Sequence, residues 1–361
     1  MGVNIISVVI LLGVLIFVHE FGHFLLAKSL GVGVLKFSLG FGPKLIGRKV
    51  GETEYMISLV PLGGYVKLLG ESDTDDVLPQ DERRSFVKQH VLKKIAIVVA
   101  GPLFNFLFAI LAFAVIFMVG VPSLTTDIGS IQPGSPAEVA GIRAGDSVQS
   151  IDGRSVGRWS DLAEIITKSG GQELTLKLKR DGTLQDVRVK PESVKAKNVF
   201  GEDVDSWKIG VGASSNTFIE RQNPIRALWT GTEQTWAITE LTLISIVKMV
   251  QGIVSPDSLG GPILIAQMAG AHVKKGIMNF VFFMALLSIN LAVLNLFPIP
   301  ILDGGHLMFF LIELVTGKEV NIKWRERAQQ VGFFILVMLM IFVFYNDIMR
   351  IFGVYCAAAW R

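Results

Sequence analysis

Four long segments of this 361-residue chain consist almost entirely of apolar residues. Each is close to the ~20 residues that a helix needs to cross the hydrocarbon core of a bilayer. The segments run from Val3 to Leu26, from Ile95 to Val119, from Asn279 to Pro298 and from Val331 to Phe352. Because a backbone in lipid must satisfy its own hydrogen bonds, such segments are expected to be helices. We therefore predict an α-helical polytopic membrane protein with four transmembrane helices.

The composition favours a membrane protein over a soluble one. Hydrophobic residues make up 51% of the chain and charged residues 18%, whereas about 25% of a typical soluble domain is charged. The net charge of +3 gives no indication of nucleic-acid binding, so the expected surroundings are the lipid bilayer. The single cysteine, Cys356, excludes an internal disulfide.

The first apolar segment ends in the motif His-Glu-Phe-Gly-His at residues 19–23, and no ionisable side chain occurs from Val3 to Val18. On a helix, residues four apart lie on one face, so His19 and His23 can bind one metal ion. Glu20 lies beside them and can take a proton from a metal-bound water. On a soluble helix the motif also occurs by chance, but ionisable groups are costly at membrane depth. The motif therefore indicates a zinc site.

Basic residues predict the orientation of the four spans. Eleven Lys and Arg lie between the first two spans, and Lys318, Lys323, Arg325 and Arg327 lie between the last two. Short cytoplasmic loops carry such an excess of basic residues. We therefore expect both connections in the cytoplasm, both termini and the long middle segment outside, and the motif at residues 19–23 near the cytoplasmic side.

A third zinc ligand is expected at the same depth, with the fourth position left to water or substrate. The third span ends at two prolines, and Asp303-Gly304-Gly305 follows shortly afterwards. Proline cannot continue a regular helix and glycine permits a sharp turn, so Asp303 is presented from broken backbone. Alone, Asp303 would be an ordinary turn residue or helix cap. Beside the histidine motif it is predicted to be the third ligand.

These motifs together resemble the site-2 protease (M50-type) family of intramembrane zinc metalloproteases, in particular its bacterial RseP-like branch of regulated intramembrane proteolysis. The resemblance rests first on residues 19–23 and on the Asn-x-x-Pro-x-Pro-x-x-Asp-Gly pattern from Asn295 to Gly304. It extends over most of the chain through Gly40-Phe-Gly-Pro43, Pro61-Leu-Gly-Gly-Tyr-Val-Lys67, Gly101-Pro-Leu-Phe-Asn-Phe106 and Gly260-Gly-Pro262.

The resemblance implies one zinc ion per chain, bound by His19, His23 and Asp303. It implies that Glu20 is the catalytic general acid and base acting on zinc-bound water. The residues that it implies for substrate binding are Asn295, Gly63, Gly64 and Tyr65. The resemblance also covers Asn105. For this residue the sequence alone leaves open that the side chain only forms a hydrogen bond between two helices, beside the small Gly101.

The resemblance also implies a location in the bacterial cytoplasmic (inner) membrane. The implied substrate is a single-span membrane protein, such as an anti-sigma factor trimmed beforehand by a site-1 protease, or a remnant signal peptide. The implied reaction is hydrolysis of a peptide bond within or near the transmembrane segment of that substrate.

The segment from Ser38 to Lys67 contains a strand pattern from Thr53 to Val60, flanked by glycines and prolines suited to hairpin turns. We predict a membrane-associated β-hairpin or sheet here. Its unpaired edge could hold a substrate in extended form by strand addition. The alternative is a cytoplasmic hairpin with no special role.

Residues 121–214 differ in composition from the apolar segments on either side. They resemble a PDZ domain of the bacterial protease type, a β-rich α+β fold. The resemblance rests on Gly134-Ser-Pro-Ala137, Ala140-Gly-Ile142, Gly145-Asp-Ser-Val148 and Ile151-Asp-Gly-Arg154. Alternating residues predict strands over Leu174–Lys179 and Val187–Lys190 and a helix over Asp161–Lys168. This extracytoplasmic domain is expected to filter substrates by strand addition; the alternative is a spacer.

Four parts of the chain are expected: an N-terminal membrane half (1–120), the PDZ domain (121–214), an amphipathic helical linker (215–275) and a C-terminal membrane half (276–361). Within the linker, residues 223–252 suggest a pair of amphipathic helices, and Trp236 to Val250 is expected to lie at the membrane interface or to be reentrant rather than to span the membrane.

Two other functions remain open. One is a catalytically silent zinc-binding membrane scaffold acting through its PDZ domain, although scaffolding needs no general base. The other is a transporter, in which broken helices are also expected. Internal repeats and additional buried acidic residues are not evident in the sequence, which makes transport the weaker alternative.

Overall fold

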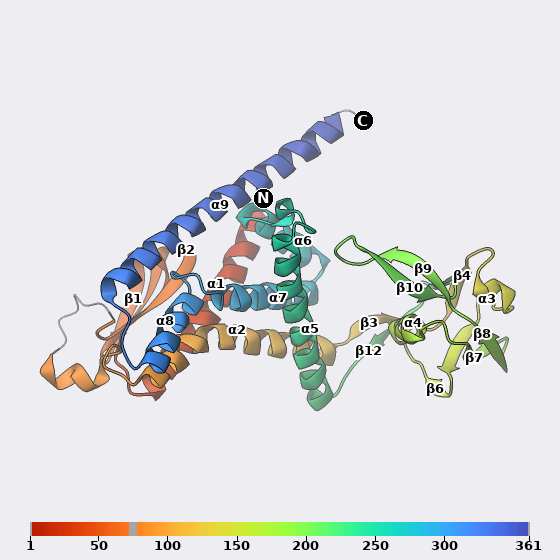
Figure 1. The fold of residues 1–361 in the computed structure, drawn as a ribbon, viewed down its shortest axis with the longest axis horizontal. Helices are drawn as coiled ribbons and strands as arrows, with labels where there is room; N and C mark the ends of the chain where they lie inside the picture. Colours follow the sequence, from red (N-terminus) through yellow and green to blue (C-terminus); the bar gives the residue numbers. More distant parts are fainter. Residues whose placement is uncertain (1, 72–77, 360–361) are drawn as a thin grey trace. The chain divides into compact units, whose positions relative to one another are not determined.

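The computed structural model describes residues 2–71 and 78–359 of the chain. It separates into two compact units (Figure 1). Unit 1 combines Met1–Ile116 with Pro224–Arg361, and unit 2 consists of Phe117–Asn223. Unit 2 contains the whole of the range 121–214 expected for the PDZ domain.

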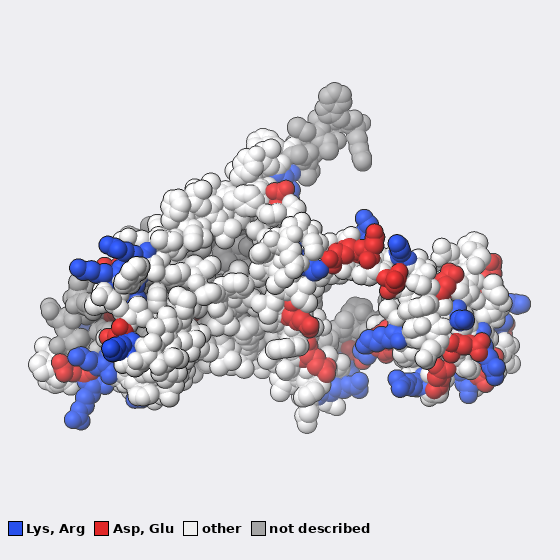
Figure 2. All heavy atoms as spheres, in the orientation of Figure 1, with Lys and Arg blue, Asp and Glu red and all other residues white. Residues whose placement is uncertain are grey.

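Unit 1 is built around four long apolar helices: α1 (Gly2–Ser29), α2 (Val91–Val119, whose last turn enters unit 2), α7 (Ile277–Asn295) and α9 (Ile322–Ala359). All four are long and apolar enough to cross a membrane, which confirms the prediction of four such helices. Between 22% and 44% of each span is buried within the protein. The remaining apolar surface faces outward, and Figure 2 shows few charged side chains over these helices. Such a surface suits lipid contact.

Three further helices complete unit 1: α5 (Pro224–Val250), α6 (Pro262–Lys275) and α8 (Asp303–Thr316), with short 3-10 turns at Pro79–Arg84 and Pro256–Ser258. The expected pair of amphipathic helices over 223–252 is wrong, because α5 runs unbroken through this range. No proline occurs inside it, and its one internal glycine, Gly231, packs against the backbone of α2 at Ile110. Helix α6 packs against α1, α7 and α9.

Two long strands, β1 (Val34–Val50) and β2 (Thr53–Leu68), fold back on each other and pack against α1. Phe37 lies opposite both Tyr55 and Val66, so the first half of β1 lies between the two halves of β2. The second half of β1 pairs with the first half of β2. The strands that the sequence predicts are therefore present, and the segment 64–68 forms one edge of the sheet.

Helix α9 contains a buried acidic residue, Asp347, which the sequence analysis did not expect. Its side chain is 1% exposed and accepts backbone N–H bonds of 2.9–3.0 Å from Gly261, Ile263 and Leu264. These donors form the first turn of α6, where free N–H groups and the helix dipole favour a carboxylate. Arg350 also lies 3.6 Å from Asp347. Asp347 therefore joins α9 to the start of α6.

Unit 2 is a small β-rich fold. Its sheet has the strand order β6-β5-β7-β8, and the pairs β4–β11, β3–β12 and β9–β10 are separate. Its elements are β3 (Val121–Leu124), β4 (Ile128–Ile131), α3 (Pro136–Val139), β5 (Ser147–Ile151), β6 (Arg154–Ser155), α4 (Trp159–Lys168), β7 (Leu174–Arg180), β8 (Thr183–Val189), β9 (Glu192–Lys197), β10 (Asp203–Lys208), β11 (Val211–Ala213) and β12 (Thr217–Glu220). The predicted helix and both predicted strands are present.

The core of unit 2 forms from one face of β7 and one face of α4. In β7, Leu174, Leu176 and Leu178 alternate with exposed residues and are buried, as expected of a strand with one face on a core. Leu162 and Ile166, four residues apart on α4, pack into the same cluster. Unit 2 thus has its own hydrophobic core, whereas its surface is rich in charged side chains (Figure 2).

Candidate metal centre and catalytic site

Helix α1 carries His19, Glu20 and His23 in its last third. His19 is 9% exposed, and its Nε2 atom lies 3.3 Å from Nε2 of His23. The spacing of four residues on the helix thus brings both imidazoles to one point, as the sequence predicts.

Asp303 reaches the same point from the other half of unit 1. It is the first residue of α8, and the N-cap position belongs to Leu302. The turn before α8 is tight: a Cβ on Gly304 would lie 2.5 Å from the carbonyl carbon of Leu296, and one on Gly305 would lie 2.7 Å from that of Ile299. Only glycine fits at these positions, and this close packing directs Asp303 toward α1.

The three side chains have the spacing of a zinc site. Asp303 Oδ2 lies 3.1 Å from Nε2 of His19 and 3.5 Å from Nε2 of His23. Zinc-ligand bonds of about 2.0–2.1 Å in a tetrahedron place neighbouring donors about 3.3–3.4 Å apart. The Oδ2 atom of Asp303 is buried and has no hydrogen-bond partner among the residues that the structure describes, as expected of a metal ligand. His19, His23 and Asp303 therefore fit a zinc ion, with the fourth position open.

Two glycines allow α1 and α2 to approach closely at this centre. A Cβ on Gly22 would lie 2.8 Å from the carbonyl carbon of Ala100, and one on Gly101 would lie 2.6 Å from Cε1 of His23. The backbone of α2 is also close enough for its Ile97 carbonyl to accept a 2.8 Å hydrogen bond from Nδ1 of His23. The close contact of the two helices thus orients an imidazole.

Asn105 also lies on α2, four residues after Gly101, and is fully buried. Its side-chain amide is 3.2 Å from Nδ1 of His19, and its backbone carbonyl accepts a hydrogen bond from Ser288 of α7. Asn105 therefore joins two helices through its backbone carbonyl, and its side-chain amide faces a histidine of the metal centre.

A cavity of about 310 Å³ opens at the centre, and Glu20 lines it together with His19, His23 and Asp303. Two of the residues expected to contact substrate, Gly64 and Tyr65, line this cavity from β2. Gly64 lies against α1, where a Cβ would be 3.0 Å from Cγ of Glu20. The cavity therefore places a carboxylate beside the three possible ligands and beside the edge of β2.

The two other expected contact residues lie differently. Asn295 ends α7, and its Nδ2 atom is 3.4 Å from Nε2 of His19, so it adjoins the metal centre directly. Gly63 is outside the lining of the cavity and lies against the ring of Phe41, with a φ of 133° that favours glycine.

Sequence reasoning did not single out His306 or Glu71, which also line the cavity. His306 lies three residues after Asp303 on α8, a spacing that puts both on one helix face and could have identified it. Burial, together with the nearby Arg325, lowers the pKa of His306 below its ordinary value. His306 therefore adds an imidazole to the cavity wall, beside the three possible zinc ligands.

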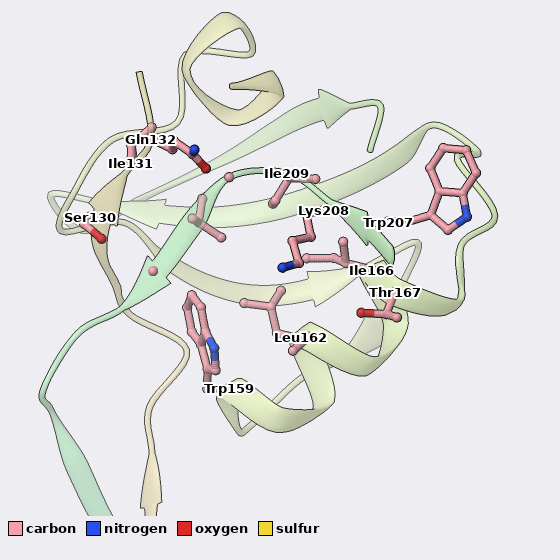
Figure 3. Close-up of a pocket in the computed structure, with 14 residues that line it drawn as sticks. Ser130, Ile131, Gln132, Trp159, Leu162, Ile166, Thr167, Trp207, Lys208 and Ile209 are labelled. Atoms are coloured by element: carbon pink, nitrogen blue, oxygen red, sulfur yellow. The ribbon is translucent and has the colours of Figure 1, made fainter. Parts of the chain in front are cut away.

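Unit 2 contains a second concave site. A groove of about 490 Å³ lies between α4 and residues 207–212, which run from the end of β10 into β11. Trp159 and Leu162 point from α4 toward the segment that holds Ile209 (Figure 3). A PDZ domain from an SdrC-like protein of Listeria monocytogenes matches 24% of this chain and 84% of its own, with 20% identity and a TM-score of 0.20.

Known proteins similar to this one align with nearly the whole chain. It is 36% identical to a candidate zinc metalloprotease of Rhizobium meliloti, with 95% of this chain and 96% of that protein aligned. It is 31% identical to protease RseP of Yersinia pestis and 30% identical to the regulator of sigma-E protease RseP of Salmonella typhimurium, with 96% of this chain and 99% of each relative covered. The model of peptidase family M50 matches residues 7–339. The chain therefore belongs to peptidase family M50 and is a zinc metalloprotease related to RseP.

Proposed function

We propose that this protein hydrolyses a peptide bond within or near the transmembrane segment of a single-span membrane protein. The observation that carries this proposal is the position of the donor set, because His19 and His23 lie toward the end of an apolar helix long enough to span a bilayer. Ionisable groups in such a helix are retained for function. The substrate class, an anti-sigma factor type or a remnant signal peptide, follows from the family resemblance.

In the proposed mechanism His19, His23 and Asp303 hold the zinc ion. When bound, zinc would polarise the scissile carbonyl and lower the pKa of a water, which could then lose a proton and attack that carbonyl. Glu20, in the cavity wall, takes the proton of the attacking water and then delivers it to the departing amine. Asn295, beside His19, binds the substrate backbone near the cleaved bond.

The edge of β2 is proposed to hold the substrate. A helical segment hides its carbonyls in its own hydrogen bonds, so it must be unwound before cleavage. In the part of the chain that the structure describes, the strand partners of Gly64, Tyr65 and Val66 all lie in β1, and the cavity that Glu20 lines is lined by these three residues as well. An extended substrate added to this edge would present its backbone to Glu20.

The membrane arrangement is proposed from charge. The basic connections 27–94 and 317–330 lie in the cytoplasm under this proposal, and unit 2 and both termini lie outside the inner membrane. Unit 2 acts as a PDZ domain whose groove filters substrates, some of which have been trimmed by a site-1 protease. The groove offers an apolar wall from α4 and, opposite it, strand β11, whose one partner among the described strands is β4, so that a peptide could add along its other edge.

Membrane peptides from cells test the proposal. Cells that contain the native chain should lack fragments that accumulate when Glu20→Gln replaces it, because the variant retains its zinc ligands but has no general base. Glu240→Gln is a matched control, since Glu240 is exposed on α5 and should leave the fragments unchanged. Identical fragments in all three strains, at equal protein levels, would favour the silent zinc-binding scaffold instead.

A further inference from the structure

The tautomer of His19 is constrained by the geometry of the metal centre. Its Nε2 atom faces Asp303 and His23, at 3.1 and 3.3 Å. A neutral imidazole that binds a cation through Nε2 carries its proton on Nδ1. Nδ1 of His19 must therefore donate a hydrogen bond, and the group beside it is the side-chain amide of Asn105, 3.2 Å away.

The orientation of the Asn105 amide decides whether this bond can form. The structure places Nδ2 toward His19 and leaves Oδ1 buried, with no hydrogen-bond partner in the described part of the chain. Two N–H groups cannot pair, and an unpaired buried polar atom costs about 1–3 kcal/mol. Because the oxygen and nitrogen of an amide have nearly the same size, a half turn exchanges them without changing the packing. In the turned orientation Oδ1 accepts the proton of His19.

His23 provides an internal comparison. Its Nδ1 atom donates to the backbone carbonyl of Ile97, at 2.8 Å, also on α2. Helix α2 thus contacts the Nδ1 atom of both histidines, that of His23 through a backbone oxygen and that of His19 through a side chain. Such partners fix the ring orientation and raise the basicity of a metal-bound histidine.

We infer that Asn105 is the positioning residue of this metal centre. Its turned amide holds His19 in the tautomer that leaves Nε2 free for zinc. Gly101, one helical turn earlier on α2, lets the imidazoles approach, and Asn105 then orients the nearer of them. This inference rests on the proposed function, because it assumes that the centre binds zinc.

Zinc affinity of the purified full-length chain in detergent tests the inference, measured by competition with a chromophoric chelator. Asn105→Leu keeps the volume but removes the acceptor, so we expect affinity to fall about 10–100-fold. Asn105→Asp keeps an oxygen acceptor and should bind zinc at least as tightly as the native chain. The absorption bands of bound cobalt should change in the leucine variant and not in the aspartate variant.

A role limited to packing predicts the opposite order, because leucine fills the same space and an unpaired buried carboxylate is costly. Asn290→Leu is the matched control: Asn290 accepts a 3.1 Å hydrogen bond from Thr242 and lies on α7, so its loss should leave zinc affinity unchanged. Native affinity in Asn105→Leu would overturn the inference. If that variant fails to fold, a folded Asn105→Asp chain that has lost zinc affinity overturns it equally. Absence of zinc binding by the native chain would instead refute the proposed function.

Discussion

Replacing Gly22 by alanine perturbs the closest approach of α1 and α2, three residues after His19. The added Cβ would lie 2.8 Å from the carbonyl carbon of Ala100 and nearer still to its oxygen. Both are backbone atoms, so no side-chain rotation relieves the contact. Ordinary contact at 3.4 Å with the carbonyl carbon alone requires the helices to separate by about 0.6 Å, and the nearer oxygen requires a larger separation.

This displacement is large for a metal centre. Ligand distances in a zinc site are held within about 0.2 Å, and α2 orients the imidazoles of both His19 and His23. We expect zinc affinity to fall about 10–100-fold, as it does when groups behind metal ligands are disturbed. The overpacked contact should lower the free energy of unfolding by about 1–3 kcal/mol. The higher helix propensity of alanine offsets about 1 kcal/mol of this loss.

The assay compares Gly22→Ala with Gly13→Ala in purified chain, by chelator competition for zinc and by thermal unfolding after metal removal. Gly13 lies on the same helix, and a Cβ there meets no atom within 4 Å. Gly13→Ala should keep native zinc affinity and unfold at the same or a slightly higher temperature. Native zinc affinity in Gly22→Ala would refute the argument that this close contact positions the imidazoles.

Three further predictions concern stability. Asp347→Asn should lower the unfolding temperature of unit 1 and its free energy of unfolding by about 1–3 kcal/mol, because one carboxylate oxygen becomes an NH₂ group that faces the N–H groups of α6. An unchanged unfolding temperature would contradict the role of Asp347 in joining α9 to α6. The Arg180 guanidinium holds the pKa of Asp146 below its ordinary value of 3.8, so this pair stabilises unit 2 above about pH 4 and loses its effect as the pH falls. The difference in unfolding temperature between the native chain and Asp146→Asn should therefore shrink from about pH 6 to about pH 3, and a constant difference would exclude this cause. Chelation of zinc should destabilise unit 1 alone; an equal shift of unit 2 would contradict the assignment of the centre to unit 1.

Much of the architecture could be predicted because strong local patterns coincide with the tertiary structure. Apolar runs of about 20 residues have few alternatives to a helix in lipid, and all four appear as α1, α2, α7 and α9. His19 and His23 meet because helix geometry alone brings them together. Asp303 could be predicted only by matching its depth to theirs, since nothing local distinguishes it from a turn residue.

The remaining features depend on contacts between distant segments. Helix α6 lies within the expected helical linker, but its packing against the membrane helices was not expected, because its sequence is moderately polar, with His272 and two lysines in its last turn. Asp347 could have been noticed as an acidic residue within an apolar run, but its partners are backbone groups more than eighty residues away. Asn105 gave no sign of which helix it would face. Its amide finds His19 only when the glycines of α1 and α2 bring the two helices together.

We propose that a zinc centre with Glu20 as its base cleaves a membrane-embedded peptide. The most direct measurement takes the purified native chain and Glu20→Gln, reconstituted with the single-span remnant that accumulates in cells of the variant. Metal content and new peptide termini are read from the same samples. We expect one zinc per chain in both proteins and cleavage by the native chain only. Cleavage by zinc-loaded Glu20→Gln at the native rate would contradict it.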